Sequence, residues 1–411
     1  MDSLRHELTR FIQQPTAQQD PPALCRRLPA EAPVPDLGPL YVVSGHQEIL
    51  TVLTHPGATV DPTTVGLPRA GSTALLKVVN RMLPMRDGAD HARLKRLATT
   101  AFGHRRPEQT RERIETAARL PAPLVAAGPF ELVADLAVPL PVAVSCAVLD
   151  VPDSEHGRIT GWASLVARSL RDPFGDGPEA AVLDAEFAEF RCYVEELCAQ
   201  RAARPGDDLI SRLAAARDQG GFDAEELLAF AVMLLANGLE TLTAGLAVAA
   251  RELIRAPGPA GRVRDEPAPA AAVFDEARRL GSPVRAAARA LAREVVLGDT
   301  TVPAASVAML LYAAADRDPR RFPAPDRFDP DRPERRHLAF GHGPHHRLGT
   351  PLSLIAGAAV LRGLAEADAV RRSGTTPTES TARRHDRFAF RGIRELPVGC
   401  PPRATLAGAA A

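Results

Sequence analysis

Residues 340–349 read FGHGPHHRLG, and this short stretch decides how the rest of the chain is interpreted. It closes a segment, 317–351, that is rich in proline and glycine and is therefore predicted to be coil. One of its side chains is chemically unusual for a loop of this kind. The guanidinium of Arg347 is always protonated, so it offers hydrogen-bond donors and no lone pair to a metal.

Working outward, six further stretches accompany this loop: HARLKR (91–96), ANGLET (236–241), EARR (276–279), ADRDP (315–319), FDPDR (328–332) and RGIRELPV (391–398). In their order and spacing they resemble the cytochromes P450, whose haem loop has the pattern Phe-x-x-Gly-x-x-x-Cys-x-Gly. Phe340, Gly343 and Gly349 stand at the matching places, and Arg347 stands where the family has cysteine. The likeness runs from about residue 40 to residue 400.

The resemblance implies a mainly α structure with a small β region, the cytochrome P450 fold, and we expect one domain over residues 1–411. Residues 224–255 are the most apolar long segment and predict a central helix roughly 45 Å long. Residues 40–55 predict a strand that leads into a helix, and 284–311 predict strands with turns. The Ala/Pro/Gly-rich stretch 256–272 predicts a loop.

The resemblance also assigns a structural role to three charged residues. Glu276 and Arg279 match the family's Glu-x-x-Arg pair, and Arg332 matches its third partner. In the family these residues form a buried charge network. Such a network need not add stability, but the loss of one member leaves a buried charge without its partner.

The departure at Arg347 bears on the cofactor. A P450 needs a thiolate on its iron, and arginine cannot replace it. Positions that meet the haem propionates in the family are retained, with lysine at one place where arginine is usual: His91, Lys95, Arg289 and His345. His346 offers an imidazole as a different iron ligand. We nevertheless expect no cofactor and no metal, with these positions and Arg347 left as remnants of a haem pocket.

Composition excludes several classes of protein. The 411 residues carry 50 Lys+Arg and 50 Asp+Glu, so the net charge is zero and a nucleic-acid partner is not expected. The charged N-terminus has no signal peptide, and no apolar run is long enough and free enough of polar residues to predict a membrane span. Five cysteines in so long a chain indicate a reducing compartment, so we expect a cytoplasmic protein.

Two functional hypotheses remain. The one we prefer from the sequence is a non-catalytic auxiliary protein that binds and stabilises a glycosyltransferase of macrolide or anthracycline biosynthesis in a hetero-oligomer, because the sequence resembles P450 relatives that lack the cysteine and act in this way. The alternative is a P450-fold enzyme of secondary metabolism that works without haem or with a non-cysteine haem ligand. In that case Glu240, Thr241 and His346 are the candidate catalytic residues.

Overall fold

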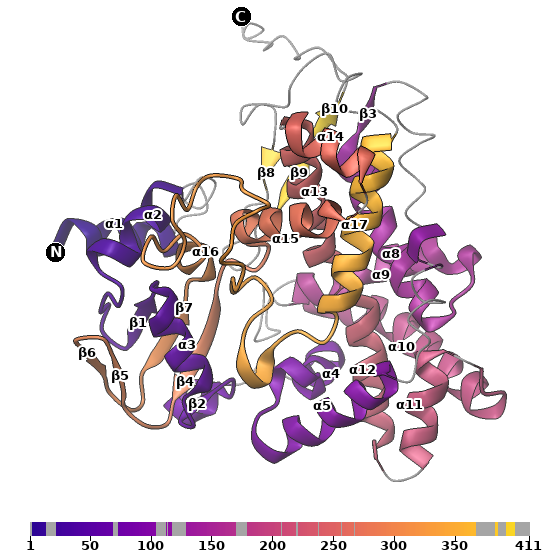
Figure 1. Ribbon diagram of the computed structural model, residues 1–411. Coiled ribbons are helices and arrows are strands. Elements are labelled where there is room, and N and C mark those ends of the chain that lie inside the picture. Colours follow the sequence, from indigo (N-terminus) through magenta and orange to yellow (C-terminus); the bar gives the residue numbers. More distant parts are fainter. Residues whose placement is uncertain are drawn as a thin grey trace, which may run out of the picture.

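A computed structural model describes residues 2–13, 22–68, 73–103, 112, 114–116, 129–169, 179–206, 208–218, 221–236, 238–255, 257–266, 268–366, 383–384 and 392–398. Helices dominate, and the predicted mainly α fold with a small β region is confirmed (Figure 1). Most strands gather with the first three helices on one side of the molecule, and the remaining short strands lie among the helices at its top. Most of the remaining helices pack together on the other side.

The β region is built around one four-stranded sheet in the order β1-β7-β4-β2. β1 runs parallel to β7, while β4 is antiparallel to both β7 and β2. The predicted strand and helix in 40–55 and the predicted strands in 284–311 are confirmed. The strands are β1 (Leu40–Val43), β2 (Ala58–Thr59), β3 (Phe130–Glu131), β4 (Ala287–Leu291), β5 (Val295–Leu297), β6 (Thr300–Val302), β7 (Val307–Leu310), β8 (Arg383–Arg384), β9 (Ile393–Glu395) and β10 (Pro397–Val398).

Of the first five helices, three lie beside the sheet, and the fourth and fifth pack on the second group of helices described below. In chain order the five are α1 (Asp2–Gln13), α2 (Pro22–Glu31), α3 (His46–Thr54), α4 (Ala74–Arg81) and α5 (Gly88–Gly103). A second group packs around the aromatic core that contains Trp162, Phe187 and Phe190. It consists of α8 (Pro139–Leu149), α9 (His156–Ser169), α10 (Ala180–Ala203), α11 (Leu209–Asp218) and α12 (Ala224–Ala236). Asp208 begins α11 as its cap, because its carboxylate accepts the Ser211 N–H at 3.0 Å.

The third group forms the centre of the molecule. Its members are α13 (Leu239–Arg255), α14 (Pro257–Asp265), α15 (Pro269–Gly281), the short α16 (Tyr312–Ala315) and α17 (Thr350–Glu366). α13, α15 and α17 pack on one another, with Leu246, Phe274 and Leu361 in their shared core. α15 carries EARR, α13 begins within ANGLET, and α17 follows the loop 340–349.

Two predicted elements need correction. The central segment 224–255 is not one helix: α12 ends at Ala236, α13 begins at Leu239, and Gly238 lies in a turn between them. Stretch 256–272 is not a loop either, since α14 occupies most of it. Ala260 and Val263 are buried on its inner face, and this packing outweighs the poor helix propensity of its glycines and prolines.

The apolar segment Ala224–Arg255 is long enough to cross a membrane by length and hydropathy alone. Three-quarters of its most apolar window is buried inside the fold, with a break in the helix within the segment. That burial is the property of a core helix, so the apolar character is explained by packing.

Candidate functional site

The loop 340–349 is a tight backbone structure that leads directly into α17. Gly341 and Gly343 have positive φ angles of 71° and 66°, which other residues adopt only with strain. The Arg347 N–H donates to the Phe340 carbonyl at 3.0 Å and closes the loop, and the His346 N–H donates to the Gly343 carbonyl at 3.0 Å. Glycine at 341 and 343 is therefore required by the shape of the loop.

This loop forms one wall of a cavity of about 600 Å³. The other walls come from α5, α8, α12, α13, β4 and the start of α17. Most lining side chains are apolar, and they include Leu83, Phe102, Val144, Val148, Met233, Leu242, Phe340 and Leu352. A cavity of this size and character is suited to a large, mainly apolar ligand.

Two of the predicted propionate positions, His91 and His345, meet at the cavity wall. Their rings lie with centroids 4.4 Å apart and their planes tilted by 31°, and His345 Nε2 lies 2.8 Å from a carboxylate oxygen of Asp87. Burial, and then the neighbouring charges of His345 and Lys95, lower the pKa of His91 to about 4. The pKa of Asp87 falls to about 2, because hydrogen bonds from His345, Thr59 and Val60 outweigh its burial.

The other two positions, Lys95 and Arg289, also line the cavity. The ammonium of Lys95 donates to the carbonyls of Pro344 and His346, so it fastens α5 to the loop. Arg289 is buried on β4, where its Nη1 donates to the Ala288 carbonyl at 2.8 Å. Both cations are thus held at the wall by backbone oxygens.

Arg347 reaches from the loop to α13. Its Nη1 donates to the Thr241 hydroxyl at 2.7 Å, and both residues line the cavity. Arg347 is half-buried at the cavity wall, and burial of its guanidinium lowers its pKa to about 10. Arg347 therefore stays cationic at neutral pH.

The remaining candidates are less closely grouped. His346 lines the cavity, and burial followed by the charges of Lys95 and His342 lowers its pKa, so its ring is neutral at pH 7 and keeps a lone pair. Glu240 is half-buried beside Thr241 and is not among the described lining residues. The structure thus brings Thr241 and Arg347 together and leaves Glu240 outside.

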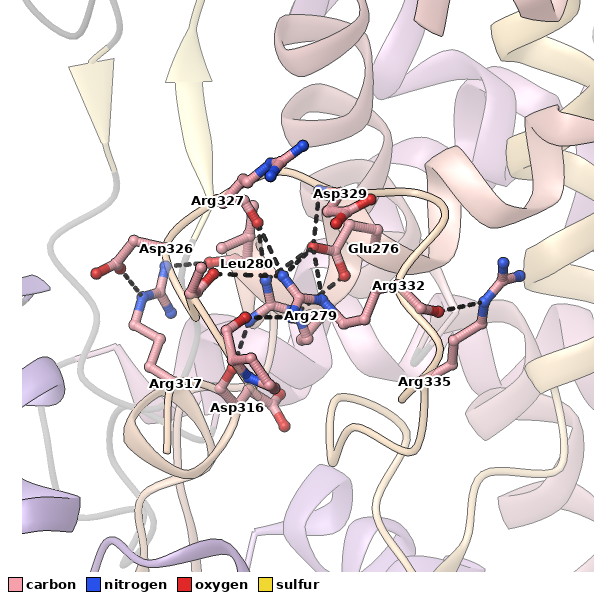
Figure 2. A network of polar contacts seen from close by, with 12 residues as sticks. Glu276, Arg279, Leu280, Asp316, Arg317, Asp326, Arg327, Asp329, Arg332 and Arg335 are labelled. Carbon is pink, nitrogen blue, oxygen red and sulfur yellow. Dashed lines mark hydrogen bonds and ion pairs between the residues drawn. The ribbon is translucent and has the colours of Figure 1, made fainter. Parts of the chain in front are cut away.

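Glu276, Arg279 and Arg332 form a buried network away from the cavity (Figure 2). Arg279 makes two hydrogen bonds of 2.8 Å to the Glu276 carboxylate, and Arg332 lies 3.3 Å from the same carboxylate. Arg279 also donates to the Asp316 carbonyl at 2.6 Å, while the Asp329 N–H donates to Glu276 at 3.1 Å. The network joins α15 to the coil between α16 and the haem-type loop.

Sequence reasoning missed two residues of the site. Asp87 lies 258 positions from His345, so only the fold brings the pair together. Arg278, beside the network in the sequence, turns the other way: its guanidinium stacks 4.2 Å over the Phe340 ring, and its Nη1 donates to the Thr241 carbonyl at 3.2 Å. The helical spacing of Arg278 from Arg279 was the available signal, since neighbours on a helix face different sides.

Comparisons with known proteins place this geometry in a family. The family model described as cytochrome P450 matches residues 270–358. The chain is 32% identical to 6-deoxyerythronolide B hydroxylase of Saccharopolyspora erythraea, over 76% of each chain. It is 35% identical to mycinamicin IV hydroxylase/epoxidase of Micromonospora griseorubida, over 76% of this chain and 78% of that one. Its fold superposes on the solved structure of CalO2 with a TM-score of 0.83 at 26% identity, over 94% and 97% of the two chains.

These findings correct the prediction that the chain has no cofactor: that prediction is wrong, because the relatives are haem proteins and point to haem. The two cations Lys95 and Arg289, together with the rings of His91 and His345, fit the two carboxylates of a haem. The axial position does not fit a thiolate-bound haem. Arg347 offers no lone pair there, and none of the four described cysteines lines the cavity.

Proposed function

The chain belongs to the cytochrome P450 family, and we propose from this membership that it is a cytoplasmic enzyme of natural-product biosynthesis that acts on a macrolide-type substrate. The observation that carries the proposal is the apolar cavity of about 600 Å³ beside α13 and the loop 340–349. Its support comes from relatives that are themselves hydroxylases of macrolide biosynthesis. They favour an enzyme over the auxiliary role that we preferred from the sequence.

Within this proposal haem is held by a ligand other than cysteine, and His346 is the candidate. It is the described histidine next to Arg347 in the loop, it lines the cavity, and its neutral ring has a lone pair to donate. Haem, when bound, would supply the oxidative chemistry of the relatives. The chain's own residues would hold the haem carboxylates and enclose the substrate, with the Thr241 hydroxyl as the buried proton donor and acceptor on α13.

The first test is the absorbance spectrum of protein expressed with an ample haem supply. We expect a haem band of the histidine-bound type in the wild type and its loss in His346→Ala. His342→Ala is the matched control, because His342 also lines the cavity, and it should keep the band. A thiolate-type spectrum with reductant and carbon monoxide, or an unchanged band in His346→Ala, would contradict the ligand assignment.

The second test is turnover. Purified protein is combined with a ferredoxin, its reductase, NADPH and a panel of macrolactones, and mass spectrometry detects products that have gained one oxygen atom. Binding of the same macrolactones is measured separately by calorimetry. If no macrolactone of the panel binds and none is converted to product, a macrolide-type substrate is excluded.

A second candidate function rests on Arg347. This cation stands where the family has its cysteine ligand, and it has no lone pair to donate to iron. We propose as the alternative that the chain binds and stabilises a glycosyltransferase as part of a hetero-oligomer, whether or not haem occupies the cavity. A protein that binds one conformation of a partner stabilises it by about 2.7 kcal/mol at a hundredfold excess over Kd. Transferase turnover should then rise and saturate with added protein, and should survive Thr241→Ala. Unchanged turnover would rule this candidate out.

A further inference from the structure

Arg347 reaches across the cavity from one wall to another. Its backbone belongs to the loop 340–349, where the Arg347 N–H donates to the Phe340 carbonyl at 3.0 Å. Its side chain ends at α13, where Nη1 donates to the Thr241 hydroxyl at 2.7 Å. Both residues line the cavity, so the contact crosses the space between the loop and α13.

Both ends of this contact are fixed by the fold. At the loop, the Thr350 hydroxyl donates to the Arg347 carbonyl at 2.8 Å. At α13, Thr241 is buried in the first turn, and its carbonyl accepts a hydrogen bond of 3.2 Å from Arg278 Nη1. A hydrogen bond with a charged donor is about twice as strong as a neutral one. The contact therefore ties the loop to α13.

A haem needs the space that this contact occupies. An axial ligand from the loop meets the iron at right angles to the macrocycle, so a haem held at the loop lies between the loop and α13. Atoms in contact across each face of a ring stay about 3.5–4.0 Å from it, so groups on opposite faces are roughly 7 Å apart. The 2.7 Å between Arg347 Nη1 and Thr241 Oγ1 leaves no room for a ring.

We infer that the Arg347 side chain is a gate on haem binding. Haem binds only after the hydrogen bond between Arg347 and Thr241 breaks and the guanidinium leaves the space between the loop and α13. The inference rests on the proposed function and adds the step that precedes ligation by His346. Any further contact of Arg347 in the closed position makes opening more costly. Because a ligand that binds only one conformation has its apparent affinity reduced by the fraction of that conformation, the gate weakens haem binding.

The experiment titrates the full chain, expressed without added haem, with two probes. Hemin and iron-free protoporphyrin IX share the macrocycle and the two carboxylates, but only hemin has an iron that a cation repels. Absorbance and porphyrin fluorescence give the two Kd values. We expect Arg347→Ala to lower both at least tenfold, a difference of about 1.4 kcal/mol. A gain for hemin alone would mean that charge and not space is the cause, and the inference would be wrong.

A second variant separates the hydrogen bond from the size of the arginine. Thr241→Val keeps the size of the residue and removes the acceptor of Arg347, so it frees the guanidinium without enlarging the cavity. It should lower both Kd values at least threefold. Ser145→Ala is the matched control, because it removes a lining hydroxyl from α8, and it should change both values less than twofold.

The outcomes for the gate and for the proposed function are distinct. If Arg347→Ala or Thr241→Val binds the two probes no more tightly than the wild type does, or if Ser145→Ala gains as much as Thr241→Val, there is no gate at Arg347. This holds whether or not the wild type takes up haem. The haem band of the wild type, and its loss in His346→Ala, test the proposed function by themselves.

Discussion

At the scale of single residues, the site is a set of cations and histidines whose protonation the fold controls. Arg347 and Arg278 keep their charge although burial lowers the pKa of each. His91 is the opposite case, because its low pKa makes it neutral at pH 7. The difference follows from chemistry: a guanidinium holds its proton through a large shift, while an imidazole loses it after a small one.

His91 gives a prediction about pH. Its pKa is about 4 in the folded chain against an ordinary value of 6.5, so the unfolded chain binds a proton between these values and the folded chain does not. Stability is therefore present above pH 6.5 and is lost as the pH falls toward 4. His91→Gln should remove this part of the loss, on the order of 1–2 kcal/mol after solvent screening. Urea unfolding at pH 7.5, 6, 5 and 4.5 measures it. If the free energy of unfolding falls with pH equally in the variant and the wild type, the prediction is wrong.

Two sequence motifs show what could be predicted at this scale. The likeness of 340–349 to a haem loop located Arg347, His345 and His346 at one site without a structure, because local spacing fixes a loop. It did not reveal Asp87 or the turn of Arg278 toward Phe340, since both contacts depend on how distant helices pack. The expectation of an empty haem pocket failed for another reason: it weighed one residue above the ancestry of the whole chain.

At the scale of elements, α15 connects the cavity to the buried charge network. Phe274 and Arg278 on this helix face α13 and α17, while Glu276 and Arg279 face the coil that precedes the loop. One helix thus fixes both α13, with Thr241, and the segment that leads to Arg347. Packing also explains the error in predicting α14. The composition of this stretch indicates a loop, but burial of Ala260 and Val263 in the core makes it a helix.

Glu276 is the first element-scale test. Glu276→Gln leaves Arg279 and Arg332 buried without a carboxylate, which should cost about 3–5 kcal/mol in the free energy of unfolding. Asp331→Asn is the matched control. It removes an exposed carboxylate that pairs with Arg262, and it should cost less than about 1 kcal/mol. Denaturant titration measures the free energy of unfolding of both variants. If the two variants lose a similar amount, burial of the network does not account for its contribution to stability.

The contact of α15 with α17 gives the second element-scale test. A Cβ at Gly357 would overlap the Phe274 ring, so Gly357→Ala should destabilise the protein by about 1–3 kcal/mol despite the better helix propensity of alanine. Gly261 in α14 has no neighbour within 4 Å of such a Cβ. Gly261→Ala should therefore stabilise by about 0.5–1 kcal/mol. Thermal unfolding should move in opposite directions for the two variants.

At the scale of the whole molecule, the buried side chains form several clusters. One joins α1 and α2 to the sheet edge through Leu8, Phe11 and Leu28, while a larger one holds α13, α15 and α17 around the cavity. The two clusters share no residue. Local opening of the first should therefore leave the site intact, since stability varies across a structure with the local core.

Leu8→Ala tests this independence. The side chain is fully buried, and its loss should cost about 2–5 kcal/mol where it packs. Amide hydrogen exchange should become faster in α1 and α2, with α13 and α15 unchanged. Faster exchange throughout α13 would show that the clusters unfold together.

The burial of the network around Glu276 also fixes how its ion pairs respond to electrolyte. A charge at the surface loses most of its reach at physiological ionic strength, where the Debye length is about 8 Å, but a charge walled off by protein is screened far less. Added sodium chloride would weaken an exposed pair such as Arg262 and Asp331, whose side chains are half open to water. It would leave the pairs of Glu276 with Arg279 and Arg332 nearly as strong in brine as in dilute buffer. The core of the chain would then keep its ion pairs at any salinity, while the surface would lose the strength of its own.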